Sequence, residues 1–358
     1  MKGSISHAVA FGTALLQMKQ RKIPSESPDI SSDPFRERSP SMARAGMQLL
    51  GGRFEFASNS ERLLRLVDSA YAGLPRHRFA GPIPRLRVRL ELTARHRPGR
   101  AAEPLAFRML SGAGILGGAT DSSNFVAISA RDRAALVVVS EDMLRFAYHT
   151  RYELIEFAVF TLAARVQGLI PLHGACVAHG GRGLLLMGES GAGKSTTALH
   201  CLLQGFDFVS EDSVFVAPTT MLATGVANFL HVRANSLRFL RRPADASRIR
   251  KSPVIRRRSG VEKFEVDLRQ LPYRLAPAPV RLAGLIFVSA RHGAAGSLLT
   301  PLTTRRLVAS LRSSQAYAVN QSGWKAFERH ATGLPAYELR RGRHPLEAVE
   351  ALRALIWP

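Results

Sequence analysis

The first half of the chain alternates between strand-like and helix-like spacing of its apolar residues. Residues 86–92 place leucine or valine at every second position, with arginine and glutamate between them, which is the pattern of a half-buried strand. Two apolar runs at 124–129 and 134–140 flank a polar turn, so we predict a hairpin. We also predict a strand at 53–57, a helix that starts after Asn59 or Ser60 and ends before Gly73, and a helix at 151–166.

The second half contains a run that is apolar almost without interruption. Gly183–Met187 has this character, which is typical of a strand buried on both faces. A glycine-rich loop follows, and then a helix that ends at Gly205, because glycine is favoured just after helix C-termini. The next strand, 206–210, ends at the acidic pair Glu211-Asp212. Downstream we predict strands at 285–289 and 336–339 and helices at 235–240, 303–313, 324–332 and 345–356.

These patterns divide the chain into three parts. Residues 1–46 are rich in Ser, Pro and charged residues and have no apolar period, so we expect a disordered leader, with order beginning near Leu49. Residues 47–165 read as a smaller N-terminal α+β domain in which no chemistry is visible. Residues 166–358, where buried strands alternate with helices, predict an α/β domain.

Composition narrows the class of protein. Hydrophobic residues make up 46% of the 358 and charged residues 22%, which is ordinary for a globular protein and excludes a collagen or a coiled coil. The two cysteines, Cys176 and Cys201, exclude a disulfide framework and a cysteine-based zinc cluster. The longest apolar stretch, Leu154–Leu172, contains Glu156 and Arg165, so we expect no transmembrane helix. We therefore expect a cytoplasmic protein with reduced cysteines and no membrane partner.

The unusual quantity is the net charge of +23. Such a charge can indicate nucleic-acid binding. No nucleic-acid recognition module is visible, however, and the 7% of aromatic residues do not interleave the basic positions, so we expect no nucleic-acid partner. The basic residues concentrate in 231–260, where ten Lys and Arg stand against the single acid Asp245. This segment either meets phosphate or an acidic peptide, or it is a solvated surface loop.

The strongest motif is the loop Gly188–Ser195, which reads Gly-Glu-Ser-Gly-Ala-Gly-Lys-Ser. It satisfies the phosphate-loop pattern G-x-x-x-x-G-K-[ST] in the context that the motif requires, between a strand and a helix. Its glycines let backbone N–H groups approach phosphate oxygens, and the helix N-terminus adds partial positive charge. Lys194 would reach the β- and γ-phosphates, and the Ser195 hydroxyl would bind Mg²⁺. We therefore predict ATP and Mg²⁺ as cofactors, with ATP bound by Gly188, Glu189, Ser190, Gly191, Ala192, Gly193, Lys194, Ser195 and Thr196.

Two carboxylates follow the next strand. Because the carboxyl ends of parallel strands meet at one edge of a sheet, Glu211 and Asp212 are expected to lie near the loop. One carboxylate there can hold Mg²⁺ and another can accept a hydroxyl proton, and Asp212 is the better candidate of the two. The alternative is an exposed acidic turn. His173 lies just before the hairpin that leads into the loop, where a lone histidine more often has a structural role.

Together these residues resemble the C-terminal catalytic domain of bacterial HPr kinase/phosphorylase and its related serine kinases. The resemblance covers about residues 170–217 and rests on His173, the loop Gly188–Ser195, Gly205 and the pair Glu211-Asp212. It implies a phosphate-loop domain of the HPr-kinase/PEP-carboxykinase-like fold.

That family's mechanism is attack by a Ser hydroxyl on the γ-phosphate of ATP. Carried across, it makes Asp212, Glu211, His173 and Lys194 the catalytic residues and Ser195 and Asp212 the Mg²⁺ ligands. The resemblance implies an ATP-dependent serine kinase whose partner is a protein or peptide that carries the acceptor Ser.

Two departures from the family pattern bear on the substrate. The first acid of the pair is Glu211 where the family has Asp. The family's Glu-x-x-Gly-x-Gly stretch is replaced by Asn228–Arg233, so the resemblance leaves open whether phosphorylase activity is retained and whether HPr is the substrate. Chains with a long, divergent N-terminal part of this kind resemble kinases found beside peptide natural-product genes. Two alternatives stay open, a catalytically reduced nucleotide-binding regulatory module and a small-molecule kinase of the same fold, and so does a homo-oligomeric state.

Overall fold

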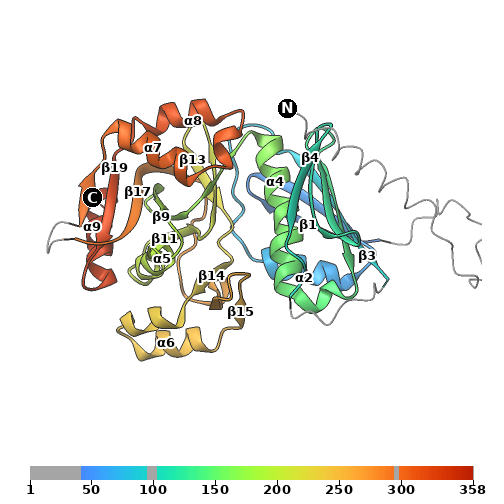
Figure 1. Ribbon diagram of the computed structural model, residues 1–358, viewed down its shortest axis with the longest axis horizontal. Coiled ribbons are helices and arrows are strands. Elements are labelled where there is room, and N and C mark those ends of the chain that lie inside the picture. The colour runs from blue at the N-terminus through green and yellow to red at the C-terminus, as the bar shows by residue number, and fades with distance from the viewer. Residues whose placement is uncertain (1–41, 95–102, 294–297, 358) are drawn as a thin grey trace, which may run out of the picture.

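The computed structural model describes residues 42–94, 103–293 and 298–357, and these form a mixed α/β structure with two lobes (Figure 1). We call residues 42–167 the N-terminal lobe and the described residues from 168 onward the C-terminal lobe. Each lobe is built on its own large mixed sheet. None of the described helices is both long and apolar enough to cross a membrane.

The sheet of the N-terminal lobe has seven strands in the order β1-β2-β3-β7-β6-β5-β4, with β3 parallel to both of its neighbours. The strands are β1 Ala43–Leu49, β2 Gly52–Ser58, β3 Arg85–Thr93, β4 Arg108–Gly112, β5 Ile115–Asp121, β6 Asn124–Ser129 and β7 Ala134–Ser140. The helices α2 Glu61–Tyr71 and α4 Glu156–Gln167 cover one face of this sheet (Figure 1). A short α-helix, α3 Ala147–His149, and a π-helical turn, η2 Thr150–Ile155, lead into α4 after the 3-10 turn η1 Met143–Phe146.

Alternation in β3 explains how this sheet packs. Leu86, Val88 and Leu90 are buried against the helices, while the arginines between them are exposed. The strands predicted at 53–57, 86–92, 124–129 and 134–140 and both helices are confirmed, although Ser60 begins α2 without a side-chain capping bond.

The expected start of order near Leu49 was wrong, because β1 begins at Ala43, inside the predicted leader. β1 is an edge strand that is only partly buried: Ala45, Met47 and Leu49 pack on the core, and its backbone pairs with β2. Strands β4 and β5 were also missed. β4 is exposed along its length, and the glycines of β5 weaken its strand signal. The rest of the predicted leader, 1–41, lies outside the described residues.

The sheet of the C-terminal lobe has nine strands, with β11-β9-β10-β17-β13-β12-β8 in order, β19 beside β17 and β18 beside β19. The strands are β8 Ile170–His173, β9 Ala175–His179, β10 Arg182–Met187, β11 Asp207–Ser210, β12 Ser213–Ala217, β13 Leu222–Gly225, β17 Val280–His292, β18 Leu299–Pro301 and β19 Ala336–Arg341. β10 is parallel to β17, and β17 is parallel to β19.

The helices of this lobe lie on both faces of its sheet. Leu184 and Leu186 of β10 face the core under α5 Lys194–Leu203 and α9 Pro345–Ile356, while Leu185 and Met187 face the core under α7 Thr304–Ser314 and α8 Trp324–Ala331. All four side chains are fully buried, which confirms the prediction of a strand buried on both faces. The predicted elements from 285 onward are confirmed as well.

A small sheet and a helix from the basic segment complete the C-terminal lobe. The sheet has the order β14-β16-β15. Its strands are β14 Phe229–Val232, β15 Val254–Arg256 and β16 Glu262–Asp267, and the helix is α6 Pro243–Arg250; 3-10 turns are η3 Ala234–Phe239, η4 Leu268–Gln270 and η5 Ala318–Asn320. The helix predicted at 235–240 is instead the 3-10 turn η3, which begins after Arg233 and has no side-chain cap.

Candidate functional site

The loop between β10 and α5 has a backbone that only glycine adopts easily. Gly188 and Gly193 have φ angles of +138° and +117°, in a region that favours glycine. A Cβ on Gly188 would lie 2.4 Å from the carbonyl oxygen of Val288 in the neighbouring strand β17. The loop is therefore held close to the sheet edge, with the N-terminus of α5 behind it.

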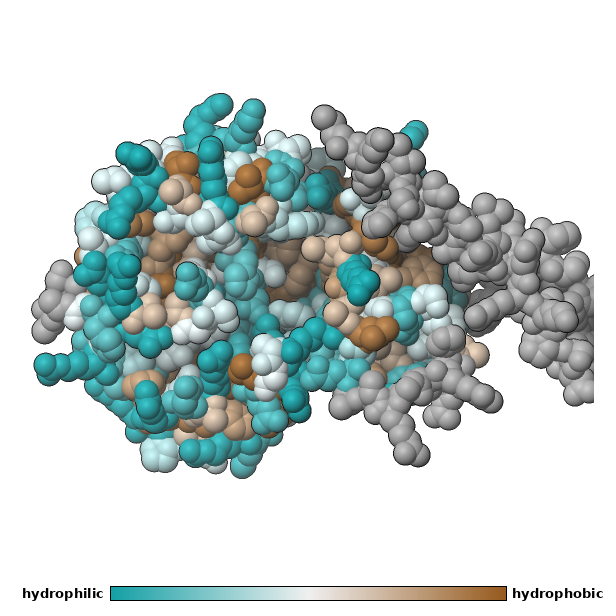
Figure 2. All heavy atoms as spheres, viewed as in Figure 1, coloured by the Kyte–Doolittle hydropathy of each residue, from teal (hydrophilic) through white to brown (hydrophobic). Residues whose placement is uncertain are grey.

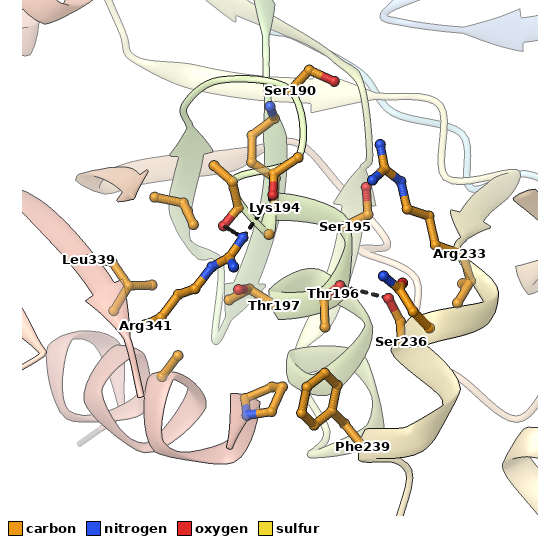
Figure 3. A pocket seen from close by; sticks show the side chains of 18 of the residues that line it. Ser190, Lys194, Ser195, Thr196, Thr197, Arg233, Ser236, Phe239, Leu339 and Arg341 are labelled. Atoms are coloured by element: carbon orange, nitrogen blue, oxygen red, sulfur yellow. Dashed lines mark hydrogen bonds between the residues drawn. The ribbon is translucent and has the colours of Figure 1, made fainter. Parts of the chain in front are cut away.

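Lys194 folds back onto the loop that precedes it. Its Nζ donates hydrogen bonds to the carbonyl oxygens of Gly188, at 2.6 Å, and Glu189, at 3.1 Å. Burial of this side chain lowers the pKa of Lys194. From the opposite side, the Arg341 guanidinium at the end of β19 donates to the carbonyl oxygen of Gly191 at 2.8 Å (Figure 3). Two cations thus bracket the loop.

A cavity of about 290 Å³ opens beside the loop. The loop residues from Ser190 to Thr196 line it, and Thr196 forms a 3.0 Å hydroxyl–hydroxyl hydrogen bond with Ser236 on η3 (Figure 3). Among the described residues that line the cavity, Asp212 is the one carboxylate. Its cations are Lys194, Arg233, Arg238, Arg257, Lys263, Arg340, Arg341 and Arg343. Such an excess of positive charge suits a ligand that carries several phosphates.

Glu211 is brought directly against the loop. Its Oε1 accepts a hydrogen bond from Ser195 Oγ at 2.7 Å, and its Oε2 accepts one from the backbone N–H of His231 at 2.8 Å. The expectation of parallel neighbours was wrong in one respect, because β11 pairs with β9, and β9 runs antiparallel between β11 and β10. β10 and β11 still point the same way, so their carboxyl ends share one edge.

Asp212 is tied to two side chains that the sequence did not single out for it. Its Oδ2 accepts hydrogen bonds from the Arg257 guanidinium, at 2.8 Å, and from the Tyr152 hydroxyl, at 3.0 Å. Burial raises the pKa of the Asp212 carboxyl, but the charge of Arg257 outweighs it and holds this pKa well below its usual value. Asp212 is therefore an ionised carboxylate paired with a cation.

His173 lies at the end of β8, beside Asp212. Its Nδ1 is 3.2 Å from the backbone carbonyl oxygen of Asp212, so the contact does not involve the carboxylate. The backbone of His173 is held by Gln315, whose Oε1 accepts from the N–H at 2.7 Å and whose Nε2 donates to the carbonyl at 3.0 Å. His173 lines the cavity together with Lys194, Ser195 and Asp212, so these candidate residues lie at one site, and their roles stay predictions.

A buried chain of charged groups continues behind Glu211. Glu211 Oε2 lies 2.7 Å from His231 Nδ1, and His231 Nε2 lies 3.2 Å from Glu265 Oε1, which is hydrogen-bonded to Arg151. Burial lowers the pKa of His231, but Glu211 and Glu265 outweigh it and raise the value to about 9. The sequence offered no signal for this chain. His231 stands in the stretch noted only for its lack of the family's glycines, and Arg151 is 80 residues upstream in the printed sequence.

The N-terminal lobe contributes to the site through the turn before α4. The π-helical turn η2 presents Tyr152, whose ring stacks on Tyr148 at a centroid distance of 5.4 Å. Both rings lie edge-on to the imidazole of His231, each at 6.2 Å. π-helical turns are rare and recur at functional sites, and here the turn carries a hydroxyl to Asp212.

Three side chains converge as potential metal ligands. Each of Glu211, Asp212 and His231 offers one ligand atom, and these three atoms lie within 4.8 Å of one another. The Ser195 hydroxyl is hydrogen-bonded to Glu211 and adds a further oxygen. Carboxylate and hydroxyl oxygens suit Mg²⁺, so the donor set fits the predicted ion through Ser195, Glu211 and Asp212.

Comparison with known proteins gives little information about the function of this protein. No family model matches the chain, and no curated protein matches it. A solved structure that does match is the HPr(Ser) kinase/phosphatase from Coxiella burnetii, with 12% sequence identity over 51% of this chain and 94% of that chain and a TM-score of 0.27. Similarity at this level carries no argument about activity, so the function proposed below rests on the site itself.

Proposed function

We propose that this protein is an ATP-dependent phosphotransferase that moves the γ-phosphate of ATP to a Ser hydroxyl on a protein or peptide, in a phosphate-loop domain of the HPr-kinase-like kind. One observation carries the proposal. A glycine loop with a lysine, a hydroxyl bonded to Glu211, and the paired carboxylate of Asp212 meet at one strongly cationic cavity. Phosphoryl transfer needs these parts, because its catalysis is mostly positioning and charge stabilisation.

The loop and its cations would bind the triphosphate. Backbone N–H groups of the loop and the N-terminus of α5 supply donors. Lys194 would exchange its bonds to the carbonyls of Gly188 and Glu189 for bonds to phosphate oxygens. Arg341 remains beside the loop as a further cation.

Ser195, Glu211 and Asp212 would hold Mg²⁺. The ion, when bound, neutralises charge that develops on the phosphate oxygens. Glu211 is the most buried of the three and is fixed by the backbone N–H of His231, so its role is to hold and orient. Asp212 is more accessible, because it lines the cavity.

Asp212 would accept the proton of the acceptor Ser. In the transfer, the Ser oxygen forms a bond to the γ-phosphorus, the bond from that phosphorus to the bridging oxygen of ADP breaks, and the hydroxyl proton passes to Asp212. The ion pair with Arg257 keeps the Asp212 carboxylate a weak base. A γ-phosphate in the cavity gives Arg257 a second anion to pair with, which frees Asp212 and stabilises the transferred group.

The test is transfer of label from γ-labelled ATP, with Mg²⁺, to a library of Ser-containing peptides. The wild-type protein and an Asp212→Asn variant are compared, with Glu61→Gln, an exposed carboxylate on α2, as the matched control. Phosphoserine that forms with wild type and control but is lost in Asp212→Asn supports the kinase. Label that appears only as inorganic phosphate contradicts it.

A nucleotide-binding regulatory module is the second candidate. The observation that favours it is the ion pair between Arg257 and Asp212, which neutralises the proposed base in this conformation. Binding of ATP without transfer to any acceptor in the same assay would support this module over the kinase.

A further inference from the structure

A second cavity, of about 310 Å³, is lined by Asp212 and His173 but by no residue of the loop 188–196. These two residues line both cavities. The proposed base therefore lies where a cationic cavity suited to phosphates adjoins a second cavity with a different lining. Two substrates can meet at Asp212 without competing for the same volume.

The second cavity lies between the lobes. One wall comes from β4 and α4 of the N-terminal lobe, with Met109, Phe157 and Phe160. The other wall comes from residues 314–321 of the C-terminal lobe, with Tyr317. Figure 2 shows a hollow between the two lobes in which apolar side chains gather. We call this cavity the interlobe groove.

The chemistry of the interlobe groove differs from that of the phosphate cavity. Apart from His173 and Asp212 at its inner end, its one charged lining residue among those described is Arg165. Met109 and Tyr317 keep 62% and 46% of their surface exposed. Large apolar side chains left open beside a reactive group indicate a binding surface. The groove therefore offers mainly apolar surface, and little charge, for binding a ligand.

We propose that the interlobe groove binds the acceptor, and that the acceptor is a peptide segment with large apolar side chains next to its hydroxyl residue. This inference rests on the proposed kinase function and names its substrate class. Apolar side chains would bury against Met109, Phe157 and Tyr317, which directs the adjacent hydroxyl toward Asp212. The volume is at the lower end of the ~300–1,000 Å³ range of ligand pockets, which fits a few peptide side chains and not a folded surface.

The inner end of the interlobe groove is rigid. Gln315 is 3% exposed and clamps the backbone of His173 from both sides. Phe160 is fixed by an edge-on contact with Phe215 at 5.3 Å. Specificity for apolar neighbours follows from such a preformed wall, because a polar side chain placed there loses its water without gaining a partner.

The experiment measures peptide binding and transfer separately. Two fluorescently labelled peptides carry a single Ser, flanked by Leu and Phe in one and by Gln and Asn in the other. Affinity is measured by anisotropy with a non-hydrolysable ATP analogue present, and transfer with γ-labelled ATP. Tyr317→Glu and Met109→Glu place a charge in the interlobe groove, and Leu105→Glu, at a residue that is 68% exposed and outside it, is the matched control.

We expect the apolar peptide to bind wild type and Leu105→Glu about tenfold or more tighter than the polar one, since burying one large apolar side chain is worth about 1.5–3 kcal/mol. Both groove variants should lose that preference while their affinity for the ATP analogue is unchanged. Equal binding of the two peptides, or a preference that survives both variants, overturns the inference. If both peptides are phosphorylated equally well, the kinase function is supported and the proposed role of the interlobe groove is contradicted. If the apolar peptide binds with the expected preference but is not phosphorylated, the groove proposal is supported and the kinase function is contradicted. If neither binding preference nor transfer is seen, both proposals are contradicted.

Discussion

Asp212 and Lys194 are each held by a group of the protein itself. Lys194 is bonded to loop carbonyls, and Asp212 is paired with Arg257. The two cations, Lys194 and Arg257, can each exchange these bonds for bonds to phosphate oxygens, so the arrangement is compatible with a bound polyphosphate. At the residue scale, these two cations are bonded to protein oxygens while the cavity as a whole keeps an excess of positive charge.

The first prediction concerns Arg257→Gln. Since the Arg257 charge holds the pKa of Asp212 down, its removal raises that pKa, and Asp212 becomes protonated at a higher pH. The acid limb of the pH profile of phosphoryl transfer should then move up by about 1–3 pH units. The matched control is Arg256→Gln, at the exposed neighbouring arginine, for which the profile should not move. An unmoved acid limb in Arg257→Gln would argue against Asp212 as the base.

At the element scale, close packing restricts the backbone conformation of the loop between β10 and α5. The loop passes over β17 so closely that the hydrogen of Gly188 cannot be replaced without a clash. The turn η2 is the second decisive element, because it carries Tyr152 to Asp212 and places Arg151 among buried acids.

The second prediction is a loss of stability in Gly188→Ala. The new Cβ would lie 2.4 Å from a backbone oxygen that cannot easily move, at a φ of +138°. Urea unfolding should show a loss of about 1–3 kcal/mol from overpacking, in addition to the backbone cost. Gly73→Ala is the control, since Gly73 has a φ of +76° and open space around it, and it isolates the backbone cost. Equal losses in the two variants would mean that the loop does not press on β17.

The third prediction concerns the pH dependence of stability through Glu156, the first residue of α4. Burial raises the pKa of its carboxyl from 4.5 to about 7, although Arg151 acts against it. Folding therefore favours the protonated form, and the stability that this group contributes is present below pH 4.5 and is lost as the pH rises through 7.

In Glu156→Gln this loss should disappear. Between pH 5 and pH 8, the free energy of unfolding of the variant should gain on that of wild type by roughly 2–3 kcal/mol. The measurement is urea unfolding at a series of pH values, with the exposed Glu61→Gln as control. Parallel curves for wild type and Glu156→Gln would show that Glu156 is ionised throughout.

At the scale of the whole molecule, the lobes are joined by buried polar contacts near the site. His77 of the N-terminal lobe is bonded to Thr224 Oγ1 at 2.7 Å and to the carbonyl oxygen of Ala276 at 2.8 Å, both in the C-terminal lobe. Asn228 donates to the carbonyl oxygen of Ala70 at 3.0 Å. Since these contacts are buried, we infer that the lobes unfold together, although each has its own sheet.

The fourth prediction tests this coupling with His77→Ala. The substitution leaves buried polar atoms of Thr224 and Ala276 without a partner, which costs about 1–3 kcal/mol. Both tryptophans, Trp324 and Trp357, are in the C-terminal lobe, so their fluorescence reports the unfolding of that lobe. If the lobes are coupled, the fluorescence transition of His77→Ala moves to lower urea. Arg78→Ala, at an exposed neighbour, should leave it in place, and an unmoved transition in His77→Ala would mean independent domains.

Local patterns were sufficient for the strand and helix on either side of the loop and for several elements from residue 285 onward. The loop motif, the buried strand before it and the helices 303–313 and 345–356 were predicted closely, because periodicity and helix-ending residues act over a few positions. The edge strand β4 was not predicted, since a strand that is exposed along its length has no apolar face in its sequence.

The sequence by itself determined that a glycine-rich loop with the phosphate-loop pattern stands between a buried strand and a helix, and that two acids follow the next strand. Only the tertiary structure decided which side chains complete the site. Tyr152 and Arg257 meet at Asp212 from opposite directions along the chain, and Glu211 meets His231 across the edge of the small sheet. The physical reason is that such pairs depend on the order of strands and on how the lobes pack. The spacing of residues along one segment contains no information on either.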